Sequence, residues 1–174
     1  MLPDWDGAAG IDHAEVRSAF AAFPSGVAAI AAVVDGAPEV LVVSSFTVGV
    51  SLDPPLMLFA VQRSSETWPR LRRSLALGVS ILGETHVESA RTLAGRDRER
   101  RLADVEYTVA PNGAIRLQGC PVSFDASVDL VHPGGDHEIV LLRVHRIHRF
   151  SEHRPLVWHH ARTRPLDPAV PAEH

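Results

Sequence analysis

Residues 122–131 have the sequence VSFDASVDLV, which carries the clearest secondary-structure signal in the chain. Apolar side chains occupy every second position, and serine or aspartate occupies most positions between them. A period of two is typical of a β-strand with one buried and one exposed face. The turn residues HPGGD follow at 132–136, and the largely apolar stretch 138–147 predicts a long strand that returns antiparallel to the first.

The same kind of pairing is predicted closer to the N-terminus. Residues 27–34 and 39–46 are mostly apolar and flank Asp35-Gly36, a dipeptide typical of tight hairpin turns. Further strands are predicted at 56–61, 75–82, 105–109 and 155–158. Short helices are predicted at 12–23, 66–73 and 85–94. The first of these helices has an apolar face, which we expect to lie on the core, formed by Val16, Ala19, Phe20 and Phe23.

This pattern predicts a mainly β, antiparallel fold of roughly seven strands with short helices. Parallel βαβ winding needs helices of about 10–15 residues in regular alternation with the strands, and this pattern is absent from the sequence. We therefore expect a small antiparallel barrel with helices packed outside it. The 174 residues suit one domain, expected at 12–164 between a flexible N-terminus at 1–11 and a flexible C-terminal tail at 165–174.

Composition narrows the classes of function. The 17 basic residues are all arginine, and 21 acidic residues bring the net charge to −4, which argues against nucleic-acid binding through overall charge. Without lysine, the chain forms neither a lysine Schiff base nor a Walker A phosphate loop. The N-terminal residues show no secretory signal, and no apolar run reaches the ~18 residues of a membrane span. We expect a cytoplasmic protein without a membrane partner.

The histidines and the cysteine do not have the spacing of a catalytic or metal site. The histidine pairs 132/137, 145/148 and 159/160 lack zinc-site spacing, and residues three apart in a strand face opposite sides. We therefore predict no metal site. Cys120 begins a strand, where a buried and inert thiol is the usual case. The sequence also lacks the GxGxxG motif of the common dinucleotide fold.

Residues 43–55, VSSFTVGVSLDPP, are a candidate ligand site. Small hydroxyl side chains cluster in this segment and leave backbone N–H groups accessible, which suits a phosphate or the polar edge of a flat ring. A serine-rich turn that binds no ligand has the same composition. Composition alone therefore leaves both interpretations open.

Five segments in order resemble the flavin reductase family, whose members are small NAD(P)H:flavin oxidoreductases that supply two-component flavin-dependent monooxygenases. The segments are FPSGVAAIAAV, VVSSFTVGVSLDPPLMLFAVQRSSETWPRL, LGVSILGE, GDHEIVLLRV and PLVWH. The resemblance covers roughly residues 14–162. It implies a split β-barrel that binds FMN, usually as a homodimer with flavin near the subunit interface.

The resemblance also implies positions for the site residues. His137, in the GDH segment, matches the histidine that the family places beside nicotinamide and flavin, so it is the expected catalytic residue. Arg96 and Arg101 are the expected phosphate contacts, because guanidinium binds phosphate in a bidentate manner; a solvated helix face is the alternative for each. Trp158 is expected to wall the flavin pocket. The other expected flavin-binding residues are Val43, Ser44, Ser45, Thr47, Ser51, Leu52, Asp53, Pro54, Ser64 and Ser65.

The implied reaction is direct hydride transfer from NADH or NADPH to FMN or FAD, with reduced flavin passing to a partner monooxygenase. The protein must then stack two flat rings and stabilise the negative charge that gathers on reduced flavin. A non-catalytic flavin- or haem-binding module on the same fold is one alternative, and an oxidase acting directly on a small substrate is another. The segment TVGVSL is one residue longer than the common TSVSL form of the family, so a different course of the chain is expected there.

Overall fold

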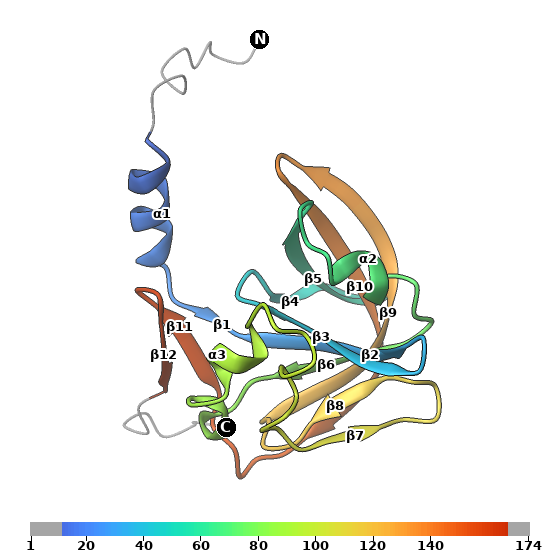
Figure 1. Cartoon of the computed structure of the whole chain (residues 1–174). Helices are drawn as coiled ribbons and strands as arrows, with labels where there is room; N and C mark the ends of the chain where they lie inside the picture. Colours follow the sequence, from blue (N-terminus) through green and yellow to red (C-terminus); the bar gives the residue numbers. More distant parts are fainter. Residues whose placement is uncertain (1–11, 167–174) are drawn as a thin grey trace.

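Strands form most of the computed structural model, which describes residues 12–166 (Figure 1). The expected flexible segments lie outside the described residues, except that strand β12 includes Pro165 and the description ends at Leu166. The strands of the main sheet are β2 (Ala28–Val34), β3 (Ala37–Val43), β4 (Thr47–Leu52), β5 (Pro55–Gln62), β6 (Leu77–Ile81), β9 (Val122–Gly134) and β10 (His137–Arg149). The smaller sheets contain β1 (Ser25–Gly26), β11 (Leu156–His159) and β12 (Arg162–Pro165), and β7 (Tyr107–Val109) and β8 (Ile115–Leu117).

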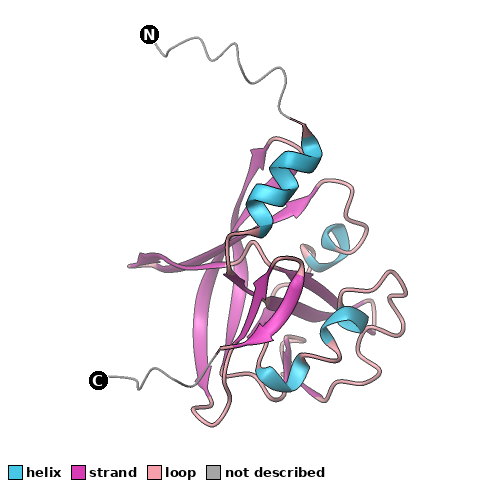
Figure 2. Ribbon diagram, turned by 90° about the vertical axis from the view of Figure 1, so that its left-hand side faces the viewer, coloured by secondary structure: helices cyan, strands magenta, loops and turns pink. Residues whose placement is uncertain are grey.

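All strand pairs in these three sheets are antiparallel, which confirms the predicted mainly β, antiparallel fold. The described residues form twelve strands, more than the roughly seven expected, because short strands such as β1 and β12 have no apolar run to mark them. The helices α1 (His13–Ala21), α2 (Trp68–Leu71) and α3 (Ala90–Leu93) lie at the periphery of the strands (Figure 2).

The predicted strand at 122–131 is confirmed as part of β9, but its polar face is not exposed along its whole length. Ser123 and Asp125 are buried, with exposed fractions of 1% and 5%. The reason is β8, which packs over this part of the sheet and carries Arg116 to within 2.9 Å of the Asp125 carboxylate. The sequence pattern therefore predicts the strand correctly, and the layer that covers its polar face comes from a distant segment.

The main sheet has the strand order β3-β2-β6-β9-β10-β5-β4, so its two edges are β3 and β4. These edges follow each other in the chain and are separated only by residues 44–46. Within that connection, the Ser45 hydroxyl donates to the Ala60 carbonyl at 2.7 Å and accepts from the Ala60 N–H at 3.0 Å. One serine side chain thus ties the connection between the two edges to the middle of β5.

Strand β4 pairs irregularly with β5. Thr47 lies opposite Leu58, and Ser51 lies opposite Leu56, so Val48, Gly49 and Val50 share a single partner position. Gly49 has a φ of 71°, a left-handed conformation that glycine adopts without strain. The bulge lies in the segment TVGVSL, where the sequence predicted a different course of the chain.

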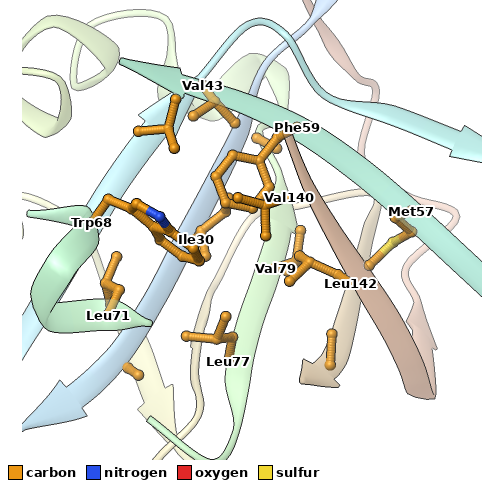
Figure 3. Close-up of a cluster of buried hydrophobic side chains, with 14 of the residues drawn as sticks. Ile30, Val43, Met57, Phe59, Trp68, Leu71, Leu77, Val79, Val140 and Leu142 are labelled. Carbon is orange, nitrogen blue, oxygen red and sulfur yellow. The ribbon is translucent and has the colours of Figure 1, made fainter. Parts of the chain in front are cut away.

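Apolar side chains are buried on both faces of β2, and this explains its run of small residues. Ala28 and Ile30 belong to one buried cluster, whereas Ala29 and Ala31 belong to a second. The first cluster is shown in Figure 3, where α2 contributes Trp68 and Leu71. The Trp68 ring packs edge-on against Phe59 with centroids 5.2 Å apart. The short helix α2 is therefore held by packing.

Helix α1 contradicts the expectation that its apolar face lies on the core. No residue of α1 is buried, and Phe20 and the nearby Phe23 each have an exposed fraction of 74%. Figure 1 shows the helix standing clear of the main sheet. The helix predicted at 85–94 is also wrong as a continuous element, because it divides into a 3₁₀-helix at Glu84–His86 and α3.

Candidate functional site

A cleft of about 810 Å³ opens where the end of β3 faces the end of β5. The turn after β5, the first residue of β10 and the segment after α3 complete its walls. The cleft brings together eight of the predicted site residues, which come from four separate parts of the chain. They are Val43, Ser44, Ser45, Ser64, Ser65, Arg96, Arg101 and His137.

The serines that line the cleft differ in how much of their hydrogen-bonding capacity is left. Ser45 is engaged with both main-chain groups of Ala60. Ser65 accepts from the Trp68 N–H at 3.2 Å and so supports the start of α2. Ser64 makes a longer contact of 3.4 Å with the Gln62 amide oxygen, and the Ser44 hydroxyl makes no hydrogen bond to another described residue. Ser44 and Ser64 are therefore the hydroxyls best able to bind a ligand.

Arg101 is fixed against the wall of the cleft by three neutral acceptors. Its Nε donates to the Gly95 carbonyl at 2.7 Å, and its Nη1 donates to the Val40 carbonyl at 3.0 Å and to Thr67 Oγ1 at 2.8 Å. Val40 belongs to the edge strand β3, whose outward carbonyls have no neighbouring strand. Burial lowers the pKa of the Arg101 guanidinium. The side chain thus holds residues 95–101 onto the sheet edge, and its hydrogen bonds all go to uncharged groups.

A buried carboxylate fixes the other end of this segment. Glu39 has an exposed fraction of 5%, and it accepts from Arg70 Nε at 2.6 Å and from Arg98. Burial alone would raise the pKa of Glu39, but the hydrogen bonds and charges of Arg98 and Arg70 hold it below its ordinary value. Glu39 is therefore ionised and shared by two guanidiniums.

The cleft carries an excess of positive charge. Arg98 is neutralised by Glu39, whereas Arg101 hydrogen-bonds only to uncharged groups. Arg96 is exposed and forms no ion pair within residues 12–166. Glu66 is the one acidic side chain among the described lining residues. Such a site suits an anionic ligand, and guanidinium donors match the geometry of phosphate.

His137 lies at the opposite wall, paired with Asp136. The histidine Nδ1 is 2.7 Å from Asp136 Oδ1, and this hydrogen bond lowers the pKa of Asp136. An ionised carboxylate only accepts, so Nδ1 carries the proton and Nε2 is left for a ligand. His137 also lies opposite Gln62 in the register of β10 and β5, which places it beside the turn at 62–65.

Comparison with known proteins gives the family. The profile of the Flavin reductase like domain matches residues 20–167. The chain belongs to this flavin reductase-like family. The family prediction from the sequence is therefore confirmed.

Relatives of known name agree with this assignment. The chain is 32% identical over 164 residues to the reductase subunit HsaB of a flavin-dependent monooxygenase from Rhodococcus jostii, covering 93% of this chain and 83% of the relative. It is 31% identical over 150 residues to a flavin reductase of Pseudomonas putida, covering 86% and 87% of the two chains.

Solved structures resemble the whole flavin reductase-like domain. The homologue of nitrilotriacetate monooxygenase component B from Mycobacterium thermoresistibile has a TM-score of 0.85 at 29% identity, covering 94% of this chain and 92% of that one. An NADH:FAD oxidoreductase of Streptomyces globisporus, solved with NAD and FAD fragments, has a TM-score of 0.84 at 27% identity, covering 92% and 96%. These likenesses confirm the predicted split-barrel class.

The remaining predicted site residues of this flavin reductase-like chain do not line the cleft. The turn at Leu52–Pro54 joins β4 to β5. Its last residue, Pro54, precedes Ala60 by six residues, roughly 20 Å at a rise of ~3.3 Å per residue. Trp158 lies in β11 opposite Ser25 and packs against the second buried cluster. The predicted residues that lie outside the cleft are Thr47, Ser51, Leu52, Asp53, Pro54 and Trp158.

Sequence reasoning missed several lining residues, including Gln62, Glu66, Thr67 and Arg98. The first three lie in the family segment VQRSSETW, and Arg98 lies in the arginine-dense stretch 96–101, so both signals were available. What the sequence could not show is that these two segments meet at one sheet edge, through the hydrogen bond between Arg101 and Thr67.

The cysteine and the metal-ligating side chains of the flavin reductase-like domain do not add a second reactive site within residues 12–166. Cys120 is buried as predicted, and burial raises the pKa of its thiol to about 12. Within the described range, no three or more His, Cys, Asp or Glu side chains gather as a metal site. None of the helices between residues 12 and 166 is long and apolar enough to cross a membrane.

Proposed function

We propose that the chain is an NAD(P)H-dependent flavin reductase that acts by direct hydride transfer and supplies reduced FMN or FAD to a separate cytoplasmic monooxygenase. The observation that carries the proposal is the composition of the cleft. Guanidiniums without a carboxylate partner, serine hydroxyls and a histidine line it together with apolar side chains such as Val43 and Val61. The names of relatives support it, since one is the reductase subunit of a flavin-dependent monooxygenase and another is an FMN reductase (NADH).

The chemistry of the donor set fits a flavin phosphate ester. Flavin, when bound, supplies the acceptor for the hydride of reduced nicotinamide. Arg96 and the remaining donors of Arg101 would bind the phosphate, because both guanidiniums lack a carboxylate partner at the cleft. Ser44 and Ser64 would bind the polar edge of the ligand, and the buried Val43 and Val61 would contact its apolar surface.

His137 would stabilise negative charge and need not form a covalent bond. A protonated imidazole donates from both nitrogens, so it donates from Nδ1 to Asp136 and from Nε2 into the cleft. A donor placed where charge develops lowers the barrier of the step that creates the charge. Asp136 acts as a positioning residue in this arrangement, because its hydrogen bond to Nδ1 fixes the orientation of the ring.

The test is the oxidation of NADH or NADPH by the purified chain, with FMN or FAD supplied in turn as acceptor. The reaction is monitored through the absorbance of the reduced nicotinamide. Turnover with at least one pair is expected. His137→Ala is expected to lower kcat/KM by about 10–100-fold through loss of the donor. The matched control is His132→Ala, an exposed histidine on β9 that does not line the cleft, and it should keep the original rate. Equal rates in the two variants would remove the role proposed for His137.

The rival function is a flavin- or haem-binding module without turnover. The same assay separates the two functions, since the rival predicts tight ligand binding with no nicotinamide oxidation by any pair. A chain that bound flavin but oxidised neither NADH nor NADPH would overturn the reductase proposal and favour this rival.

We further propose a homodimer with flavin near the subunit interface. Two apolar surfaces support it: Phe20 and Phe23 at α1, and Val48, Val50 and Leu52 along β4, all exposed. Burial of such surfaces is what a second copy would provide. A dimer would also give the hairpin residues 51–54 a route to the flavin of the other copy.

The double variant Phe20→Ser, Phe23→Ser tests this dimer by sedimentation velocity. It is expected to shift the protein from dimer to monomer, with little loss of far-ultraviolet circular dichroism because these residues are exposed in one chain. Leu75→Ser is the control, since Leu75 is 93% exposed and lies far along the chain from both surfaces. A monomeric original protein would contradict the proposal.

A further inference from the structure

A separate cavity of about 470 Å³ lies between the β7–β8 hairpin and the far part of β10, and we call it the hairpin cavity. Its described lining residues and those of the flavin cleft do not overlap. His145 lines it and lies eight residues along β10 from His137, roughly 26 Å at a rise of ~3.3 Å per residue. In Figure 1 the β7–β8 hairpin is at the bottom and the turn between β9 and β10 is at the top. The cavity volume falls within the ~300–1,000 Å³ of typical ligand pockets.

The apolar wall of the hairpin cavity is held in place by packing and by main-chain hydrogen bonds. Ala76, Ala110 and Ala114 form a small buried cluster, which joins the chain before β6 to the turn between β7 and β8. In that turn, the Ala110 N–H donates to the Ala114 carbonyl at 2.8 Å, and the Gly113 N–H donates to the Ala110 carbonyl at 2.9 Å. A ligand with an apolar body therefore meets a surface that is already formed. The apolar lining residues are Leu75, Ala76, Ala110, Pro111 and Ala126.

On the polar wall, the acidic side chain is already paired. Asp125 is the one acidic residue among the described lining residues, and its exposed fraction is 5%. Both of its carboxylate oxygens accept from Arg116 Nη1, at 2.9 and 3.0 Å. The next acidic residue along β9, Asp129, pairs with Arg143. The carboxylates on this face of β9 are therefore occupied.

Arg146 is the cation that these carboxylates leave over. It lies opposite Asp125 in the register of β10 and β9, next to a bulge that gives His145 no partner position. Arg146 is exposed and forms no ion pair within residues 12–166. Because Arg116 binds the Asp125 carboxylate, the hairpin cavity has one guanidinium more than its acidic side chain neutralises. An anionic group fits this end of the cavity.

Asn112 adds an uncharged donor to the same cavity. Its Oδ1 accepts from the Ala114 N–H at 3.2 Å, so its Nδ2 is left to donate to a ligand. A guanidinium and an amide together offer donors for both oxygens of a carboxylate. A single surplus positive charge balances a monoanion, whereas a phosphate ester carries about 1.5 to 2 negative charges at neutral pH. The charge balance therefore favours a carboxylate.

We propose that the hairpin cavity binds a small monocarboxylate with an apolar body, of the aryl carboxylate class. Arg146 and Asn112 bind the carboxylate, and the apolar body packs against the alanines and Pro111. The site goes beyond the reductase function, because its described residues are separate from those of the flavin cleft.

Isothermal titration calorimetry with three small probes tests the class of ligand. Benzoate is the aryl carboxylate, benzamide keeps the ring and removes the charge, and acetate keeps the carboxylate and removes the ring. Benzoate is expected to bind at least about tenfold more tightly than benzamide or acetate, because only benzoate uses both walls. Absence of benzoate binding, or equal affinity for benzamide, would overturn the proposal.

Arg146→Gln tests the surplus cation. The Kd of benzoate should rise by about tenfold through loss of the charged donor. The matched control is Arg149→Gln, since Arg149 is also exposed on β10 but lines neither the hairpin cavity nor the cleft, and its Kd should stay within twofold of the original. Equal Kd values in the two variants would contradict the assignment of the carboxylate to Arg146.

Two-dimensional ¹⁵N NMR of the unsubstituted protein locates the site without any substitution. Benzoate is expected to shift the amide signals of residues 110–116 and 145–146, both with and without saturating FMN. Shifts confined to residues 41–45 and 62–67 of the cleft, or loss of benzoate binding on addition of FMN, would overturn the site. Failure of the chain to reduce flavin would overturn the reductase proposal and leave these expectations unchanged.

Discussion

The two walls of the cleft are built in opposite ways. On the arginine wall, Arg101 and Arg98 are engaged with protein groups, and a buried carboxylate, Glu39, lies behind them. On the facing wall, the His137 side chain hydrogen-bonds only to Asp136 among residues 12–166, and the Asp136 side chain has an exposed fraction of 88%. Ser64 makes one long hydrogen bond there. Most polar groups of the first wall are therefore part of the fold, whereas those of the second are free to bind.

This difference separates stability from binding. A guanidinium with three protein acceptors cannot lose them without disturbing the segment that it holds, whichever ligand is present. A side chain with free donors contributes to the affinity for a ligand and little to the stability of the folded chain. Arg96 is the exception on the first wall, since it is exposed and unpaired among the described residues. Substitutions on the two walls should thus affect different measurements.

The largest effect is expected at Glu39. Glu39→Gln removes a buried charge and leaves two guanidiniums without a carboxylate, so the free energy of unfolding should fall by about 3–4 kcal/mol in urea denaturation. The matched control is Asp129→Asn, which breaks the exposed pair with Arg143 and should cost no more than about 0.5 kcal/mol. Equal losses in the two variants would show that the arginine wall is not a structural element.

The Glu39 contribution also has a defined pH dependence. The pKa of Glu39 in the folded chain lies below its ordinary value of 4.5, because Arg98 and Arg70 outweigh the effect of burial. The stabilisation is therefore fully present above pH 4.5 and is lost as the pH falls through the lower folded pKa. The difference in stability between the original protein and Glu39→Gln should shrink on acidification below that value, and a constant difference would contradict the ion-pair account.

Arg101 and Arg96 provide the sharpest comparison within one wall. Arg101→Gln loses hydrogen bonds to three acceptors and should cost about 1–3 kcal/mol of stability. Arg96→Gln should leave the unfolding midpoint unchanged and raise the Kd of flavin by about tenfold through loss of a phosphate contact. Thermal unfolding and flavin fluorescence check the two effects. If Arg96→Gln destabilised the chain and Arg101→Gln did not, the assignment of the two roles would be reversed.

Much of the fold follows from local patterns in the sequence. The alternation at 122–131 and the Asp35-Gly36 turn predict β9 and the β2–β3 hairpin, because strand period and turn chemistry act over a few residues. The exposure of Phe20 could not be predicted in the same way. A helical apolar face shows that a partner surface is favoured, and it does not say whether that surface belongs to the same chain.

The site was predictable in part, and the limits have a physical cause. The resemblance selects residues such as His137 and Ser44, which the cleft brings together. It also selects Ser45, whose hydroxyl ties the connection between β3 and β4 to β5, and Arg101, which holds residues 95–101 on β3. Those partners, Ala60 and Val40, are main-chain groups on distant strands, so no sequence motif marks them.

Hydrogen exchange followed by mass spectrometry, with and without FMN, tests the central claim that the cleft is the flavin site. We predict slower exchange on FMN addition in residues 41–45, 62–67 and 95–101, which line the cleft. Protection of residues 51–54 in addition would fit the proposed dimer. Protection that spared all three cleft segments, or appeared only around Trp158, would contradict the account.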